Sequence, residues 1–190
     1  MYRKRGFNIN KGKVVKSIIF NQHQVNHALK NGEGMFRVVV KNNQHPSINA
    51  IGGTYVESSY ITLSEIFVKE SFSKTRDIYD NSIWYWADGN PEFGDWTKPK
   101  PAQHMKQEHS RLTLRIKSVK VERLQDIKED GAKKEGFAKT FEAFPRANVI
   151  DETTSAYGNF IKFWNSTHKK PEEKWEANPW VFVYEYEVVK

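Results

Sequence analysis

Cationic and apolar side chains alternate in one short segment, and this pattern suits a surface that binds phosphate groups. The apolar positions are Leu112, Leu114 and Ile116, and the polar positions around them are Arg111, Thr113, Arg115 and Lys117. The alternation predicts a half-buried β-strand with one apolar face and one basic face. Basic faces attract polyanions through phosphate contacts and the release of counterions. We therefore expect Arg115 and Lys117 to contact nucleic-acid phosphates.

The residues after this strand predict a capped helix. Asp126 is placed to accept hydrogen bonds from the first backbone N–H groups of a helix, and Glu129 follows three residues later, as in a capping box. Gly136 comes directly after Glu135, where a left-handed residue commonly ends a helix. We predict a helix over residues 126–135.

The N-terminal tail is a second basic element. Residues 1–16 contain six cations and no acids, namely Arg3, Lys4, Arg5, Lys11, Lys13 and Lys16. The net charge of the chain is +7, and the rest of the chain holds 24 bases against 23 acids, so most of the excess lies in the tail. We expect Arg3, Lys4 and Arg5 to contact phosphates. The alternative is that the tail is simply solvated and that the basic strand is an ordinary polar surface, with no nucleic acid bound to either.

Motifs for metal or cofactor chemistry are missing from the sequence. His23 and His27 are four residues apart, a spacing that puts two metal ligands on one helix face. The chain has no H-E-x-x-H motif and no cysteine to accompany them. It also lacks a nucleophile elbow, a phosphate-binding loop and a dinucleotide fingerprint. We predict neither a metal site nor a cofactor.

Periodicity predicts an α+β protein of short strands, a few helices and long polar loops. Strands are expected at residues 17–20, 36–40, within 61–72, 111–117 and 180–189, and helices at 24–31, 126–135 and 157–164. Residues 137–153 are expected to form a loop, and residues 73–105 an irregular insertion with several Gly and Pro breakers. The domain organisation is then a basic tail (1–16) and a single domain (17–190) that carries this insertion. A small mixed β-barrel or curved sheet with flanking helices fits this element order.

The composition bears on the compartment of the protein. No apolar run approaches the length of about 18 residues that a membrane span needs. The basic N-terminus lacks the apolar segment of a signal peptide, and the absence of cysteine is compatible with a reducing compartment. We expect a soluble cytoplasmic protein without a membrane partner, and we assume a monomer.

Three stretches carry a resemblance to a known family. Ser110–Phe137 has a strand–helix signature, Trp175 to Trp180 fit a W-x-x-N-P-W pattern before the last strand, and Ile66–Phe72 is similar to L-W-V-R-E-T-W. With these stretches the chain resembles the ASCH domain family of the PUA-like superfamily, and most closely the ASCH-like proteins of phages and prophages. The resemblance implies a PUA-like small mixed β-barrel with flanking helices and long loop insertions.

The resemblance also implies a polar pocket. It would place Arg37, Lys69, Glu70 and Arg111 around a ligand, together with Trp175 and Asn178 of the W-x-x-N-P-W pattern. Glu135 aligns with an acidic residue that is implicated in amidohydrolase members of the family. Glu70, Glu135 and Lys69 are therefore weak catalytic candidates. An alternative reading makes Glu70 a buried carboxylate that holds Arg37 or Arg111 for structural reasons.

The loop that the amidohydrolases use departs from the family pattern. The family has G-R-K-T-x-T-x-R after its first helix, whereas this chain has Asn31–Arg37, with sequence NGEGMFR. Glu33 stands at the lysine position and Gly34 at the first threonine position, and the second threonine is replaced by Phe36. A glutamate reverses the charge of the lysine, which weakens a catalytic interpretation.

Three functions are compatible with this sequence. The first is a nucleic-acid-binding module, with RNA preferred over DNA because the fold's relatives are associated with RNA. The second is an amidohydrolase or nuclease that acts on modified nucleosides or RNA. The third is a phage protein-interaction or counter-defence factor with a vestigial pocket. The residues favour the first and lean against an enzyme.

Overall fold

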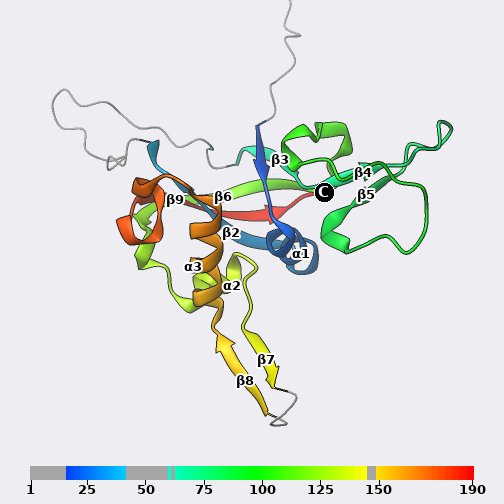
Figure 1. Cartoon of the computed structure of the whole chain (residues 1–190). Coiled ribbons are helices and arrows are strands. Elements are labelled where there is room, and N and C mark those ends of the chain that lie inside the picture. Colours follow the sequence, from blue (N-terminus) through cyan, green and yellow to red (C-terminus); the bar gives the residue numbers. More distant parts are fainter. Residues whose placement is uncertain (1–15, 42–59, 61–62, 145–148) are drawn as a thin grey trace, which may run out of the picture.

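A curved, five-stranded mixed sheet forms the centre of the fold (Figure 1). The computed structural model describes residues 16–41, 60, 63–144 and 149–190. In spatial order the strands are β1 (Ser17–Ile19), β3 (Glu65–Lys69), β6 (Thr113–Arg123), β9 (Trp180–Val188) and β2 (Glu33–Val39). β1 is parallel to β3, and the other neighbouring strands are antiparallel.

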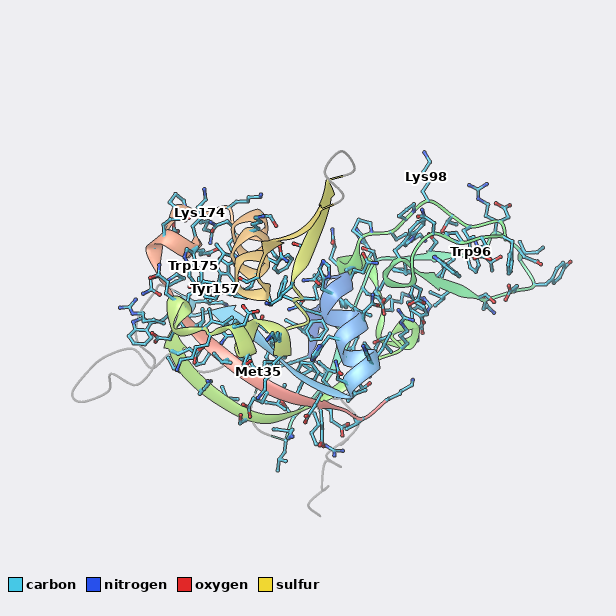
Figure 2. All side chains as sticks on the ribbon, turned by 90° about the horizontal axis from the view of Figure 1, so that it is seen from below. Met35, Trp96, Lys98, Tyr157, Lys174 and Trp175 are labelled. Carbon is cyan, nitrogen blue, oxygen red and sulfur yellow. The ribbon has the colours of Figure 1, made fainter. Side chains whose placement is uncertain are left out.

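The α+β class predicted from the sequence is confirmed, but the described sheet is not the closed barrel that was expected. Its outer strands, β1 and β2, each pair with a single neighbour and not with each other. β1 has only three residues, so it offers few backbone groups for further pairing. The long central strands β6 and β9 still curve strongly along their length (Figure 2).

Both faces of the sheet are covered, which β9 illustrates. Phe182, Tyr184 and Tyr186 point into a first core beneath helix α1 (Gln22–Asn31), while Val181 and Val183 point into a second core beneath α2 (Glu129–Lys134) and α3 (Ala156–Thr167). The predicted apolar face of β6 lies in the first core, where Leu112, Leu114 and Ile116 are buried. A β-bulge between Ile116 and Ser118 then shifts the register of β6 against β9.

The cap predicted at Asp126 is wrong. Asp126 ends a 3₁₀ turn (Leu124–Asp126), where its carboxylate accepts a hydrogen bond from the Arg123 N–H, and α2 begins three residues later at Glu129. The Glu129 carboxylate instead accepts hydrogen bonds from the Ala156 and Tyr157 N–H groups at 3.3 and 3.0 Å, so it caps α3. This cap could not be read from local spacing, because donor and acceptor are 28 residues apart.

The predicted left-handed residue at Gly136 is confirmed. Its φ is +89°, and its N–H donates to the Lys133 carbonyl at 2.9 Å, which closes the C-terminal turn of α2. The backbone of α1 passes close by, since a Cβ on Gly136 would lie 2.5 Å from the His23 carbonyl oxygen. Glycine at this position therefore allows α1 and α2 to approach each other.

Two segments expected to be loops contain ordered pairs of strands. Residues 72–101, called the arm below, include the antiparallel strands β4 (Phe72–Lys74) and β5 (Ile83–Tyr85). The rings of Trp84 and Trp96 pack 5.9 Å apart within it, and the arm projects from one end of the molecule (Figures 1 and 2). The expected loop 137–153 contains the hairpin of β7 (Thr140–Phe144) and β8 (Val149–Thr154), and this prediction is wrong.

The described helices are short: in that part of the chain none combines the length and the apolar character needed to cross a bilayer. Residues 1–15 of the tail predicted to bind phosphates, which include Arg3, Lys4 and Arg5, lie outside the described residues.

Candidate functional site

Arg37 occupies a buried ion-pair cluster between the sheet and α2. It lies on the face of β2 that packs against the second core, between Met35 and Val39. Its Nη2 donates to Glu122 of β6 at 2.6 Å, and its Nη1 donates to Glu135 at the end of α2. The Arg37 side chain is 2% exposed, so its guanidinium is largely shielded from solvent.

The two carboxylates of this cluster differ in acidity. Burial raises the pKa of Glu135 to about 7, although Arg37 opposes the shift. Burial also disfavours the charge of Glu122, but hydrogen bonds from Arg37 and Lys120 outweigh it, so the pKa of Glu122 is lowered. The cluster ties α2 to the sheet, and both terminal nitrogens of Arg37 are engaged by protein carboxylates.

A polar cleft of about 290 Å³ lies beside this cluster. It occupies the region of Asn31–Arg37, and its lining includes Glu33, Gly34 and Lys134. Glu33 pairs with Lys117 at 3.3 Å. A Cβ on Gly34 would lie 2.5 Å from Tyr186 Oη, so the packing of Tyr186 leaves no room for the threonine of the family pattern.

A second cleft of about 440 Å³ adjoins the first along the sheet and shares Met35, Lys134 and Glu185 with it. Its lining mixes both signs of charge, since it includes Lys120 and Lys128 as well as Glu122 and Asp130, and Lys120 pairs with Glu122 at 2.9 Å. A mixed lining of this kind does not form the single-sign field that concentrates a polyanion.

Arg111 belongs to a different cluster, at the base of the arm. Two parallel hydrogen bonds join it to Glu70, and two more join it to Asp88, both at 2.8 Å. Its guanidinium also stacks over the Tyr85 ring, 4.2 Å from the ring centroid. Burial raises the pKa of Glu70, and the hydrogen bonds from Arg111 oppose that shift. Arg111 and Glu70 are therefore held by protein partners.

The structure does not gather the predicted pocket residues around one space. Glu70 and Arg111 lie together, whereas Arg37 and Glu135 belong to the other cluster. Lys69 belongs to neither of these two clusters, and its ammonium group donates a hydrogen bond to the Gln103 carbonyl at 3.3 Å.

Trp175 begins a 3₁₀ turn (Trp175–Ala177) that precedes β9, and Asn178 directly follows this turn. Trp175 lies at the far end of the molecule from Trp96 and Lys98 of the arm (Figure 2). The Trp175 ring packs edge-on against Tyr157 with centroids 5.5 Å apart. Asn178 has φ +46°, and its side-chain oxygen accepts a hydrogen bond from the Gln125 N–H at 2.9 Å. These contacts connect the end of β6 to the start of β9.

The two strand residues predicted to contact phosphates have acidic neighbours. Arg115 donates to Glu65 and Glu187, both at 3.0 Å, and Lys117 donates to Glu33 at 3.3 Å. Opposite charges at these distances offset much of the field that the basic face would otherwise present.

Sequence reasoning missed a basic concavity at the base of the arm. This basic concavity has a volume of about 410 Å³, and it is lined by Phe72, Lys74, Lys100, His104, Lys106 and His109. No acid lines it. Part of the signal was visible, since residues 98–120 contain seven cations and one acid, but nothing local placed Lys74 beside them.

Strand pairing builds this concavity. Phe72 and Lys74 are two residues apart on β4, so their side chains share a face. Lys100 lies opposite Phe72 in an isolated bridge, with hydrogen bonds of 2.7 and 3.2 Å in the two directions. The following 3₁₀ turns, η3 (Ala102–His104) and η4 (Gln107–His109), bring the remaining lining residues to that face.

The charges in the concavity act on each other. Burial lowers the pKa of His109, and the positive charges of Lys74, Lys106 and Lys100 lower it further, whereas Glu108 raises it. Glu108 lies 3.7 Å from Lys106 and 3.6 Å from His109. Three lysines thus share one lining with His109, and Glu108 offsets part of their charge at the side of Lys106.

No family model, curated protein or solved structure matches this chain. The described residues also include no group of three or more acidic or histidine side chains placed to hold a metal ion.

Proposed function

We propose that this protein binds nucleic acid through the basic concavity, with RNA as the preferred polymer. The observation that carries the proposal is a concave surface that, among the described residues, is lined by three lysines, two histidines and Phe72 and by no acid. Within the described residues, the ammonium groups of Lys74 and Lys100 have no ion-pair partner, so their charges are available to phosphates. Phosphate contacts of this kind supply most of the affinity of sequence-independent nucleic-acid binding.

Two features of the sequence support the same function. The first is the basic tail of residues 1–16, which adds six cations to the chain. The second is the resemblance to the ASCH family of PUA-like proteins, which is also the reason for preferring RNA. Because Arg115 and Lys117 are compensated by acids, we assign them a smaller share of the phosphate contacts than the concavity.

The test is fluorescence-anisotropy binding to labelled single-stranded RNA, single-stranded DNA and duplexes over a salt series. A triple variant, Lys74→Ala, Lys100→Ala and Lys106→Ala, should reduce the slope of log affinity against log salt for single strands by about 2, at roughly 0.7 per lost phosphate contact. The matched control removes the same formal charge outside the concavity, with Arg115→Ala, Lys117→Ala and Lys170→Ala; Lys170 pairs with Glu173 at 2.9 Å. It should change the slope much less.

Neutralising the tail with Arg3→Gln, Lys4→Gln and Arg5→Gln measures its separate share of the slope. If the protein binds none of these RNA and DNA ligands at low salt, the proposal is wrong. Equal losses in the two triple variants would show that the concavity has no special role.

A second function, hydrolysis of modified nucleosides, is favoured by one observation. Lys134 lines both polar clefts next to Glu135, close to the position where the family's lysine is replaced by Glu33. Incubation with acetylated cytidine and chromatography of the products tests it. Product formed by the unaltered protein and lost in Lys134→Ala supports this activity, and no product from the unaltered protein excludes it for this substrate.

A further inference from the structure

We propose that the basic concavity binds a phosphate monoester at the end of a nucleic-acid strand, in preference to the diester phosphates within it. This inference rests on the proposed function and concerns the same site. It identifies which phosphate of the polymer the concavity receives.

The arrangement of the cations is the first argument. Lys74 and Lys100 come from two paired segments of the arm, and Lys106 directly precedes the turn η4, so lysines from three segments line one concavity. A backbone that runs across a surface needs cations spaced along a track. Cations that converge on one volume suit a single, highly charged group.

The amount of charge is the second argument. At pH 7.5 the three ammonium groups and the neighbouring Glu108 leave a local charge of about +2. A phosphate monoester carries about −1.5 to −2 near neutral pH. An internal diester carries one negative charge, and a monoester therefore compensates the site more fully.

The supply of hydrogen-bond donors is the third argument. A terminal phosphate presents three strong acceptor oxygens. Each lysine ammonium carries three N–H donors, and the imidazole rings of His104 and His109 add more. The His109 ring packs beside Phe72 with centroids 6.0 Å apart, so one wall of the site is fixed by a buried side chain.

The experiment compares four ligands at pH 7.5: a single-stranded oligonucleotide with a 5′-phosphate, one with a 3′-phosphate, the same sequence with hydroxyl groups at both ends, and a nucleoside monophosphate. All oligonucleotides carry their fluorophore on an internal base. We expect one of the terminally phosphorylated strands to bind about tenfold more tightly than the unphosphorylated strand, the size expected for new hydrogen bonds between charged groups.

Lys74→Ala and Lys100→Ala should each bring the affinities for the phosphorylated and the unphosphorylated strand closer together. The matched control is Lys98→Ala, which removes a lysine of the same arm (Figure 2). Lys98 is not among the residues that line the concavity. This variant should keep the preference. Circular dichroism and thermal melting of the variants verify that each is folded.

Several results would overturn the inference while leaving the proposed function intact. Equal binding of phosphorylated and unphosphorylated strands is one, and a preference that survives Lys74→Ala and Lys100→Ala is another. A nucleoside monophosphate that binds as tightly as the phosphorylated strand would show that the site receives a free nucleotide. If no oligonucleotide binds at all, the proposed function fails together with this inference.

Discussion

Arg111 and Glu70 are joined by two parallel hydrogen bonds, from Nε to Oε1 at 2.9 Å and from Nη2 to Oε2 at 3.0 Å. Glu70 directly follows β3 of the sheet, and the other side of the same guanidinium binds Asp88 of the arm. One planar cation thus fastens the arm to the sheet. Arginine suits this role because its rigid fork can bind two carboxylates in bidentate fashion.

Replacing Arg111 by Ala should destabilise the protein by about 3 kcal/mol, because it leaves the Glu70 carboxylate buried without its cation. Urea unfolding followed by tryptophan fluorescence measures the loss. Arg115→Ala is the control, since it breaks exposed ion pairs and should cost much less. If the two variants lose the same free energy of unfolding, the fastening role of Arg111 is wrong.

Glu135 should make the stability depend on pH. Its pKa is raised from the usual 4.5 to about 7 in the folded protein, mainly by burial. Between these values the unfolded chain releases the proton and the folded chain retains it. The stabilising contribution is thus complete below about pH 4.5 and is lost as the pH rises towards 7. In Glu135→Gln, which cannot ionise, the unfolding free energy should fall less over this interval, as measured by urea unfolding at a series of pH values.

Glu122→Gln is the matched control for this pH dependence. The pKa of Glu122 is lowered in the folded protein, so its contribution is present above its unfolded value and is lost as the pH falls through the folded value. This variant should therefore keep most of the wild-type slope between pH 4.5 and 7. If the unfolding free energy of Glu135→Gln falls with pH as steeply as that of the wild type, the assignment of this pH dependence to Glu135 is wrong.

Gly136→Ala should destabilise the protein more than Gly32→Ala. Both glycines have positive φ, +89° and +72°, which costs an L-residue about 1–2 kcal/mol. A Cβ on Gly136 would also lie 2.5 Å from the His23 carbonyl oxygen, whereas a Cβ on Gly32 would have no neighbour within 4 Å. Unfolding in urea compares the two, and equal losses would contradict a close approach of α1 and α2.

Gly34→Thr, which would introduce the threonine found at this position in the pattern that the sequence resembles, should be destabilising. The added Cβ would lie 2.5 Å from Tyr186 Oη and 2.9 Å from the Lys134 carbonyl oxygen. Small-to-large changes in packed positions typically cost about 1–3 kcal/mol. Tyr186→Phe removes one of these contacts, so the double variant should recover part of the lost melting temperature. No recovery would mean that Tyr186 is not the obstacle.

Elements with a local signal were predictable from the sequence. The alternation around Leu114 marked β6, the helix predicted at 24–31 is α1 at Gln22–Asn31, and the last strand begins at Trp180 as expected. The hairpin β7–β8 was missed because the expected loop 137–153 showed no clear alternation. The open edge of the sheet was missed because closure of a barrel depends on the pairing of distant strands, which no single segment of the sequence indicates.

The candidate site was harder to predict because its residues meet through pairing of distant segments. Arg37 and Glu135 are 98 residues apart in the chain, and no local pattern couples them. Lys74 reaches the basic concavity only because Phe72 pairs with Lys100. The acids that compensate Arg115 likewise come from β3 and β9, the strands on either side of it.

The cap that Glu129 provides links the folding of two helices. α2 has six residues, fewer than an isolated helix needs to be stable in water, and its first residue holds the N-terminus of α3. Local opening of α2 would release the Ala156 and Tyr157 amides at the same moment. The amide protons of α2 and of the first turn of α3 should therefore exchange with solvent as one cooperative unit, although a β-hairpin separates the two helices in the chain.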